Sequence, residues 1–140
     1  MNLNSILFVL CFMVFSCEPV YRADIVNKSN SNGIIEIYFD STTLKEFWDG
    51  NDYQGFLANY PNVFGVSSFD YDSIELKASY NLGPYSSFPL EAGIGNAPTY
   101  ILFDKIVIAL TDTIIELDNR DSIQNAFLKI DKRTWEYCLE

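Results

Sequence analysis

The stretch TYILFDKIVIALTDTIIELD, residues 99–118, has the strongest strand pattern of the chain. It is rich in Ile, Val and Phe, which favour strands, and the polar pair Thr111-Asp112 divides it into two runs. Two strand-forming runs joined this tightly are typical of an antiparallel pair. We therefore predict paired strands over 99–110 and 112–118.

Strand patterns continue on both sides of this pair. Alternating residues predict two strands around the polar turn at 27–33, with Ile35, Ile37 and Phe39 on one face of the second. The pattern returns in SIELKASYNL, where Ile74, Leu76 and Ala78 alternate with polar residues, and in PYSSFPLEAG, whose two prolines favour an edge position. Further strands are expected at 63–68 and 133–140, and a helical turn at 122–130 capped by Asp121 or Ser122.

The period changes from two to that of a helix in residues 42–61. Leu44, Phe47 and Trp48 are spaced i, i+3, i+4, and so are Tyr53, Phe56 and Leu57, with Tyr60 following at i+7. Thr43 and Glu46 have the spacing of a capping box. We predict one or two short helices here, inserted between strands.

These patterns predict an all-β fold with a short helical insertion. Seven or eight short strands, whose connections are too short for βαβ units, favour mainly antiparallel sheets. The best fit is a β-sandwich with an immunoglobulin-like layout over residues 24–140.

The N-terminus holds an apolar run from Ser5 to Ser16. As a helix these twelve residues extend about 18 Å, well below the roughly 30 Å of a bilayer core. The length suits the apolar region of a secretory signal peptide. Val14-Phe15-Ser16-Cys17 also resembles the lipobox of bacterial lipoproteins, which implies cleavage after residue 16, lipidation of Cys17 and a tether over 17–23.

An ordinary signal peptide cut near Ser16 is the alternative, and it would leave Cys17 free to form a bridge with Cys138. The mature part carries nine basic and nineteen acidic residues, a net charge of −10. This charge argues against nucleic acid as a partner and against docking on anionic lipids.

The sequence carries no catalytic signature. It has no histidine, which excludes Ser-His-Asp catalysis and zinc–histidine sites. GIGNAP at 93–98 lacks the third glycine of a dinucleotide fingerprint. We therefore expect no catalytic residues, no metal and no cofactor, although Asp49, Asn51 and Asp52, or Asp70 and Asp72, would suit a loose calcium site.

The aromatic residues of the insertion are the candidate binding residues. Trp48, Tyr53, Phe56 and Tyr60 flank the polar stretch 49–52 and would present rings to a glycan or a protein surface. Alternatively, the same residues close the end of the sandwich as part of its core.

The chain as a whole resembles small lipoproteins common in Bacteroidetes. The stretches that carry the resemblance are the lipobox, DIVNKS…IIEIYF, YNLGPYSSFPLEAG, FDKIVIALTDTIIEL and the final WEYCL. The resemblance implies a lipid-anchored envelope protein, on the periplasmic or outer face of the outer membrane. Four Asp-Ser or Asp-Thr pairs of the chain also resemble the O-glycosylation pattern of these bacteria. The acceptors would be Ser41, Ser73, Thr113 and Ser122, although residues of these types also suit turns and helix caps.

Two functions remain from these observations. The first is a non-enzymatic binding or accessory module that contacts a protein or glycan partner. The second is a structural subunit of an envelope assembly that contributes an edge strand. A small hydrolase is a distant third.

Overall fold

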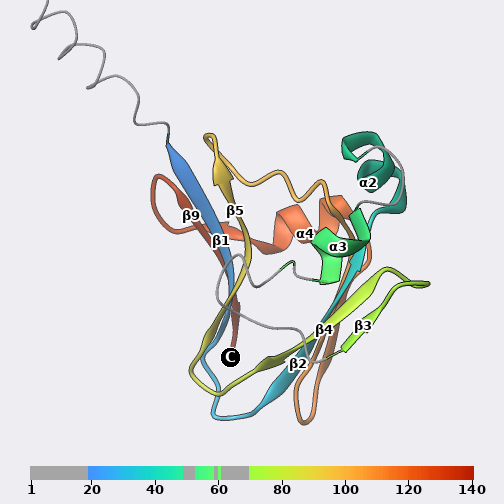
Figure 1. Cartoon of the computed structure of the whole chain (residues 1–140). Helices are drawn as coiled ribbons and strands as arrows, with labels where there is room; N and C mark the ends of the chain where they lie inside the picture. The colour runs from blue at the N-terminus through green and yellow to red at the C-terminus, as the bar shows by residue number, and fades with distance from the viewer. Residues whose placement is uncertain (1–18, 49–52, 59, 61–69) are drawn as a thin grey trace, which may run out of the picture.

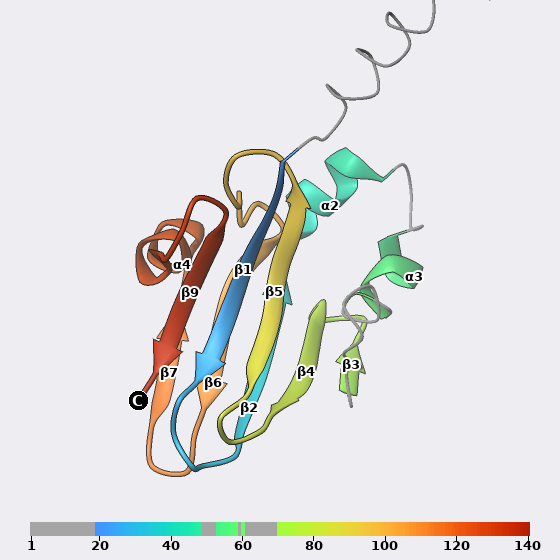
Figure 2. The same ribbon diagram turned by 90° about the vertical axis from the view of Figure 1, so that its left-hand side faces the viewer.

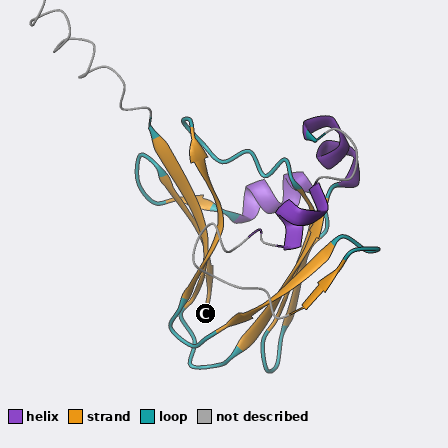
Figure 3. Cartoon of the chain, viewed as in Figure 1, coloured by secondary structure: helices purple, strands orange, loops and turns teal. Residues whose placement is uncertain are grey.

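The computed structural model describes residues 19–48, 53–58, 60 and 70–140. Within these ranges the chain forms nine strands in two sheets, together with three short helices. The predicted β-sandwich is confirmed (Figures 1 and 3). The strand expected at 63–68 lies outside the described residues.

The first sheet has the strand order β5-β1-β9-β8. Strand β1 (Val20–Asn27) pairs antiparallel with β5 (Ser87–Ile94), and β8 (Leu128–Lys129) pairs antiparallel with β9 (Thr134–Leu139). Unlike the other pairs, β1 and β9 run parallel. The chain reaches β9 through helix α4 (Arg120–Ala126) and the hairpin of β8 and β9, which return it to the end where β1 begins.

The second sheet has the order β3-β4-β2-β6-β7, and all of its neighbours are antiparallel. Its strands are β2 (Gly33–Phe39), β3 (Asp70–Asp72), β4 (Lys77–Leu82), β6 (Phe103–Ala109) and β7 (Ile114–Leu117). The pair predicted over 99–118 is confirmed as β6 and β7, with Ala109 opposite Ile114. The core lies between the two sheets, where Ile25, Ile35, Ile37, Ile106 and Ile108 are fully buried.

The two sheets lie close together at one end and diverge toward the other, which we call the wide end (Figure 1). In Figure 1 helices α3 (Tyr53–Ala58) and α4 (Arg120–Ala126) lie in the gap between the sheets, and Figure 2 shows them at opposite side edges of the sandwich. Strand β1 begins at the wide end (Figure 1). At the closed end the side chain of Asn27, which is 1% exposed, donates hydrogen bonds to Ser31 O and Gly83 O, both at 2.8 Å. Asn27 therefore holds together two loops that cross between the sheets.

The helical insertion is present as α2 (Ser41–Phe47) and α3. Asp40 caps α2, because its carboxylate accepts hydrogen bonds from the N–H groups of Thr42 and Thr43, at 2.7 and 3.2 Å. The prediction of a capping box formed by Thr43 and Glu46 is therefore wrong, because the N-cap is Asp40. Helix α4 begins one residue after Asn119, its N-cap, and Ser122 completes the capping box. The cap predicted at Asp121 or Ser122 is therefore wrong, and the helix covers 120–126 in place of 122–130.

Two predicted boundaries at the start of strands are also wrong. Strand β1 begins at Val20, so residues 20–23 belong to the fold and not to the tether expected over 17–23. Strand β4 begins at Lys77, and Ile74 is 92% exposed. The reason is a turn: Asp72 Oδ1 accepts hydrogen bonds from the N–H groups of Ile74 and Glu75, and Leu76 has a φ of 51°.

Candidate functional site

A cavity of about 250 Å³ opens at the wide end of the sandwich. We call it the wide-end cavity. Strands β1 and β5, helix α3 and the connection from β5 to β6 all contribute to its walls. Its lining residues are Tyr21, Phe56, Tyr60, Glu91, Ala92, Thr99, Ile101 and Leu102.

Glu91 is the buried acid of this cavity, and a β-bulge turns it inward. Phe88 lies opposite the fully buried Ile25, and Glu91 lies opposite the fully buried Ala23, so the two inward positions are three residues apart. Leu90 is the extra residue, at the register shift between Ala23 and Asp24. Bulges of this kind redirect a side chain to the other face of the sheet. Glu91 is consequently 9% exposed.

Four neutral donors surround the carboxylate of Glu91. Oε1 accepts hydrogen bonds from the Tyr21 hydroxyl at 2.6 Å, from the Thr99 N–H at 2.9 Å and from the Thr99 hydroxyl at 3.3 Å. Oε2 accepts one from the Tyr100 N–H at 2.8 Å. These bonds join β5 to β1 and to the second half of the connection that leads to β6, where Tyr100 has a φ of 52°.

The phenol of Tyr21 stays protonated at neutral pH. Burial raises its pKa well above the ordinary value of 10, and the hydrogen bond and the charge of Glu91 raise it further. Tyr21 therefore acts as a permanent donor to Glu91. Its ring covers Gly93, where an added Cβ would lie 2.8 Å from the Tyr21 hydroxyl oxygen.

The insertion supplies the aromatic wall. Trp48 stacks on Phe56 with ring centroids 4.7 Å apart, and Phe56 meets Tyr60 edge-on at 5.4 Å. The Tyr60 hydroxyl donates a hydrogen bond to the carbonyl of Leu90 at 2.7 Å, which ties this wall to β5.

The structure brings three of the four predicted aromatic residues together and separates their roles. Phe56 and Tyr60 line the cavity, and Trp48 supports Phe56 from behind. Tyr53 and Tyr60 belong to the core, at 7% and 5% exposed, while Trp48 and Phe56 are partly buried against it. The predicted core role is therefore present for Tyr53 and Tyr60, whereas binding by any of the four residues stays a prediction.

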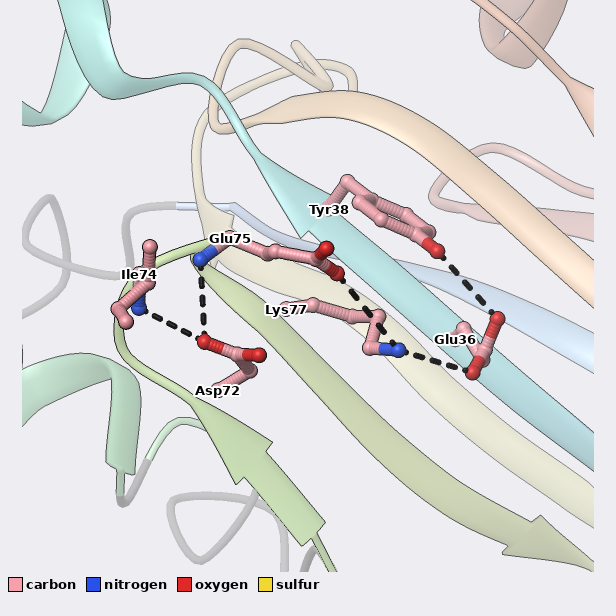
Figure 4. Close-up of polar contacts among 6 residues, drawn as sticks. All are labelled: Glu36, Tyr38, Asp72, Ile74, Glu75 and Lys77. Atoms are coloured by element: carbon pink, nitrogen blue, oxygen red, sulfur yellow. Dashed lines mark hydrogen bonds and ion pairs between the residues drawn. The ribbon is translucent and has the colours of Figure 1, made fainter.

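The outer face of the second sheet carries a different polar cluster (Figure 4). Lys77 lies 3.3 Å from Glu36 and 3.8 Å from Glu75, and the Tyr38 hydroxyl donates to Glu36 at 3.4 Å. Lys77 and Lys105 both approach the Tyr38 ring. These charges are paired and solvated, which makes the cluster a weaker candidate than the cavity.

The four predicted glycosylation acceptors are spread over the surface. Ser41 is exposed at the start of α2, Ser73 in the turn that Asp72 holds, and Thr113 before β7. Ser122 is partly buried, and its hydroxyl donates to the carbonyl of Asn119 in the capping box. Their modification stays a prediction.

The residues of the predicted calcium sites do not form a cluster within the described part of the chain. Asp49, Asn51 and Asp52 lie outside it. Asp70 and Asp72 lie on β3, where Asp72 is engaged by backbone N–H groups. Cys17 and its surroundings are also outside the described residues, whereas Cys138 is partly buried in β9. None of the described helices is long and apolar enough to cross a membrane.

Comparisons with known proteins identify no relative. The chain matches no protein-family model, no curated protein and no solved structure. The candidate function therefore depends on the residues of the wide-end cavity and on the N-terminal sequence.

Proposed function

We propose that this protein is a lipid-anchored, non-enzymatic binding module of the cell envelope, which holds a small group in the wide-end cavity. The group belongs to a ligand or protrudes from a protein or glycan partner. The observation that carries the proposal is the cavity itself: the helical insertion adds an aromatic wall to the sandwich, and a bulge places a buried carboxylate opposite it.

The geometry supports lipidation of Cys17 over a Cys17–Cys138 bridge. Cys138 lies beside Val26, about 20 Å along β1 from Val20 at roughly 3.3 Å per residue. The three residue steps from Cys17 to Val20 span at most about 11 Å. About 9 Å would remain between the two Cα atoms, and a disulfide needs less than about 7 Å.

The open edges of the sheets favour a binding module over a subunit that donates or accepts a strand. Along edge strand β5, Pro89 has no N–H to offer, and the Leu90 carbonyl is already bonded to Tyr60. The edge strands β3, β7 and β8 have three, four and two residues. Short edges of this kind discourage pairing with another chain.

A matched pair of variants on the insertion tests the proposal. Phe56→Ala removes the aromatic wall, whereas Phe47→Ala removes a ring that is 60% exposed and does not line the cavity. We expect a partner recovered by chemical crosslinking in the intact envelope to be lost with Phe56→Ala and kept with Phe47→Ala. Equal recovery with both variants would show that the cavity is not the binding site.

A further inference from the structure

The buried carboxyl group of Glu91 has no Lys or Arg side chain beside it. All nine Lys and Arg residues lie within the described ranges. The ion pairs they form join Arg22 to Asp24, Lys77 to Glu36 and Glu75, and Lys105 to Glu116 and Asp118. None of these nine side chains comes within 4.0 Å of the Glu91 carboxylate.

The hydrogen bonds around Glu91 suit a carboxylate. Each of its oxygens accepts a backbone N–H, from Thr99 and from Tyr100, so both oxygens act as acceptors, as in a carboxylate. These N–H donors do not supply the opposite charge that a buried ion ordinarily has nearby. A cationic ligand would supply it.

The rest of the cavity suits a particular kind of cation. Tyr21, Phe56 and Tyr60 contribute aromatic rings, and Ala92, Ile101 and Leu102 contribute apolar surface. Aromatic rings attract organic cations through the negative charge of their faces, and alkyl groups pack against apolar surface. A metal ion would instead require several oxygen ligands, and the described residues of the lining include one carboxylate, which already accepts hydrogen bonds.

We propose that the wide-end cavity binds an organic ammonium group, with Glu91 as its counter-charge and the rings of Phe56, Tyr60 and Tyr21 around it. This inference rests on the proposed function and specifies its ligand class. A volume of about 250 Å³ admits a trimethylammonium group with a short alkyl chain. Free amines and the head groups of zwitterionic lipids share this chemistry.

A pair of isosteric probes tests the charge directly on the unmodified protein. Choline and 3,3-dimethylbutan-1-ol have the same shape, but choline has a positively charged nitrogen where the alcohol has carbon. The full mature protein, held in an uncharged maltoside detergent, is titrated with each by calorimetry. We expect choline to bind at least about tenfold more tightly, and its affinity to fall as salt is added.

Matched variants assign the effect to Glu91. Glu91→Gln removes the charge and keeps the shape, so choline affinity should fall at least about tenfold. Glu116→Gln makes the same change at an exposed residue on the other sheet, paired with Lys105, and should leave the affinity unchanged.

A competition experiment separates the two sources of the ammonium group, free amines and lipid head groups. Choline is titrated in the presence of phosphatidylglycerol vesicles that contain or lack phosphatidylethanolamine. Competition by phosphatidylethanolamine identifies a lipid head group, and its absence identifies a free amine.

Two results would overturn the inference. If the alcohol binds as tightly as choline, the cavity recognises shape and apolar surface alone. If neither probe binds, the cavity does not take an ammonium group. In either case, a crosslinked partner that is still lost with Phe56→Ala would leave the proposed function intact. Because the comparison of probes uses the unmodified protein, it stands even if Glu91→Gln does not fold.

Discussion

Removing the hydroxyl of Tyr80 should stabilise the protein. Tyr80 is fully buried on the inner face of β4, and its hydroxyl has no hydrogen-bond partner among the described residues. Burial raises the pKa of this phenol well above its ordinary value, so it stays neutral. Tyr80→Phe keeps the ring, including its contact with Phe88 at 4.9 Å between centroids.

The expected size follows from the missing bond. A buried polar group without a partner costs about 1–3 kcal/mol. Tyr80→Phe leaves almost no cavity and removes that cost, so the free energy of unfolding should rise by about 1 kcal/mol or more. The free energy of unfolding should fall instead where the tyrosine hydroxyl that is removed has a hydrogen-bond partner. Tyr60→Phe loses the bond to the Leu90 carbonyl, and stability should fall by about 1 kcal/mol. Tyr21→Phe loses the bond to the Glu91 carboxylate, at a cost of about 1.5–3 kcal/mol.

Urea denaturation of the four proteins, monitored by circular dichroism, measures these differences. The slope of the free energy against urea concentration should stay the same, because none of the changes alters how much surface unfolding exposes. A loss of about 1 kcal/mol in Tyr80→Phe would refute the reasoning, because it would mean that this hydroxyl is bonded in solution. Equal effects at all three positions would refute it as well.

Three further changes have defined outcomes. Gly93→Ala should displace the Tyr21 ring from Glu91 and lower the free energy of unfolding by about 1–3 kcal/mol in urea melts. Gly55→Ala, with no atom within 4 Å of its new Cβ, should raise this free energy by about 0.5–1 kcal/mol. Equal effects of the two changes would contradict the close contact at Gly93. Cys17→Ala should move the protein from the detergent phase to the aqueous phase of a Triton X-114 separation, and wild-type protein in the aqueous phase would argue against the lipid. Above about pH 10 the tyrosines of the unfolded chain ionise, whereas burial keeps Tyr60 and Tyr80 protonated in the folded protein. The free energy of unfolding should therefore fall by about 1.4 kcal/mol per pH unit for each of the two residues. An unchanged urea melt above about pH 10 would contradict their burial.

Much of the fold could be predicted because side-chain alternation is a local signal. The pairing of β6 with β7 and the helical insertion followed from short-range patterns in the sequence. The start of β4 did not, because the turn held by Asp72 competes with a strand pattern that begins at Ile74. The parallel pairing of β1 with β9 joins opposite ends of the chain, and no local pattern specifies it.

The candidate site was predicted in part. The aromatic residues were identified because their helical spacing set them apart from the surrounding strands. Glu91 was not, because alternation from Phe88 would place Leu90 inward and Glu91 outward. The extra residue at the bulge leaves Leu90 fully buried and turns Glu91 inward as well. The signal available was Pro89, since proline inside a strand often accompanies a bulge or an edge.

The early start of β1 also limits where the protein works. If Cys17 carries a lipid, at most about 11 Å of chain separates the bilayer from Val20. The wide end of the sandwich would then lie next to the lipid head groups. The loops that Asn27 holds together would then point away from the membrane. A partner diffusing in from solution would meet those loops first. The cavity would be open mainly to molecules that already travel along the membrane surface.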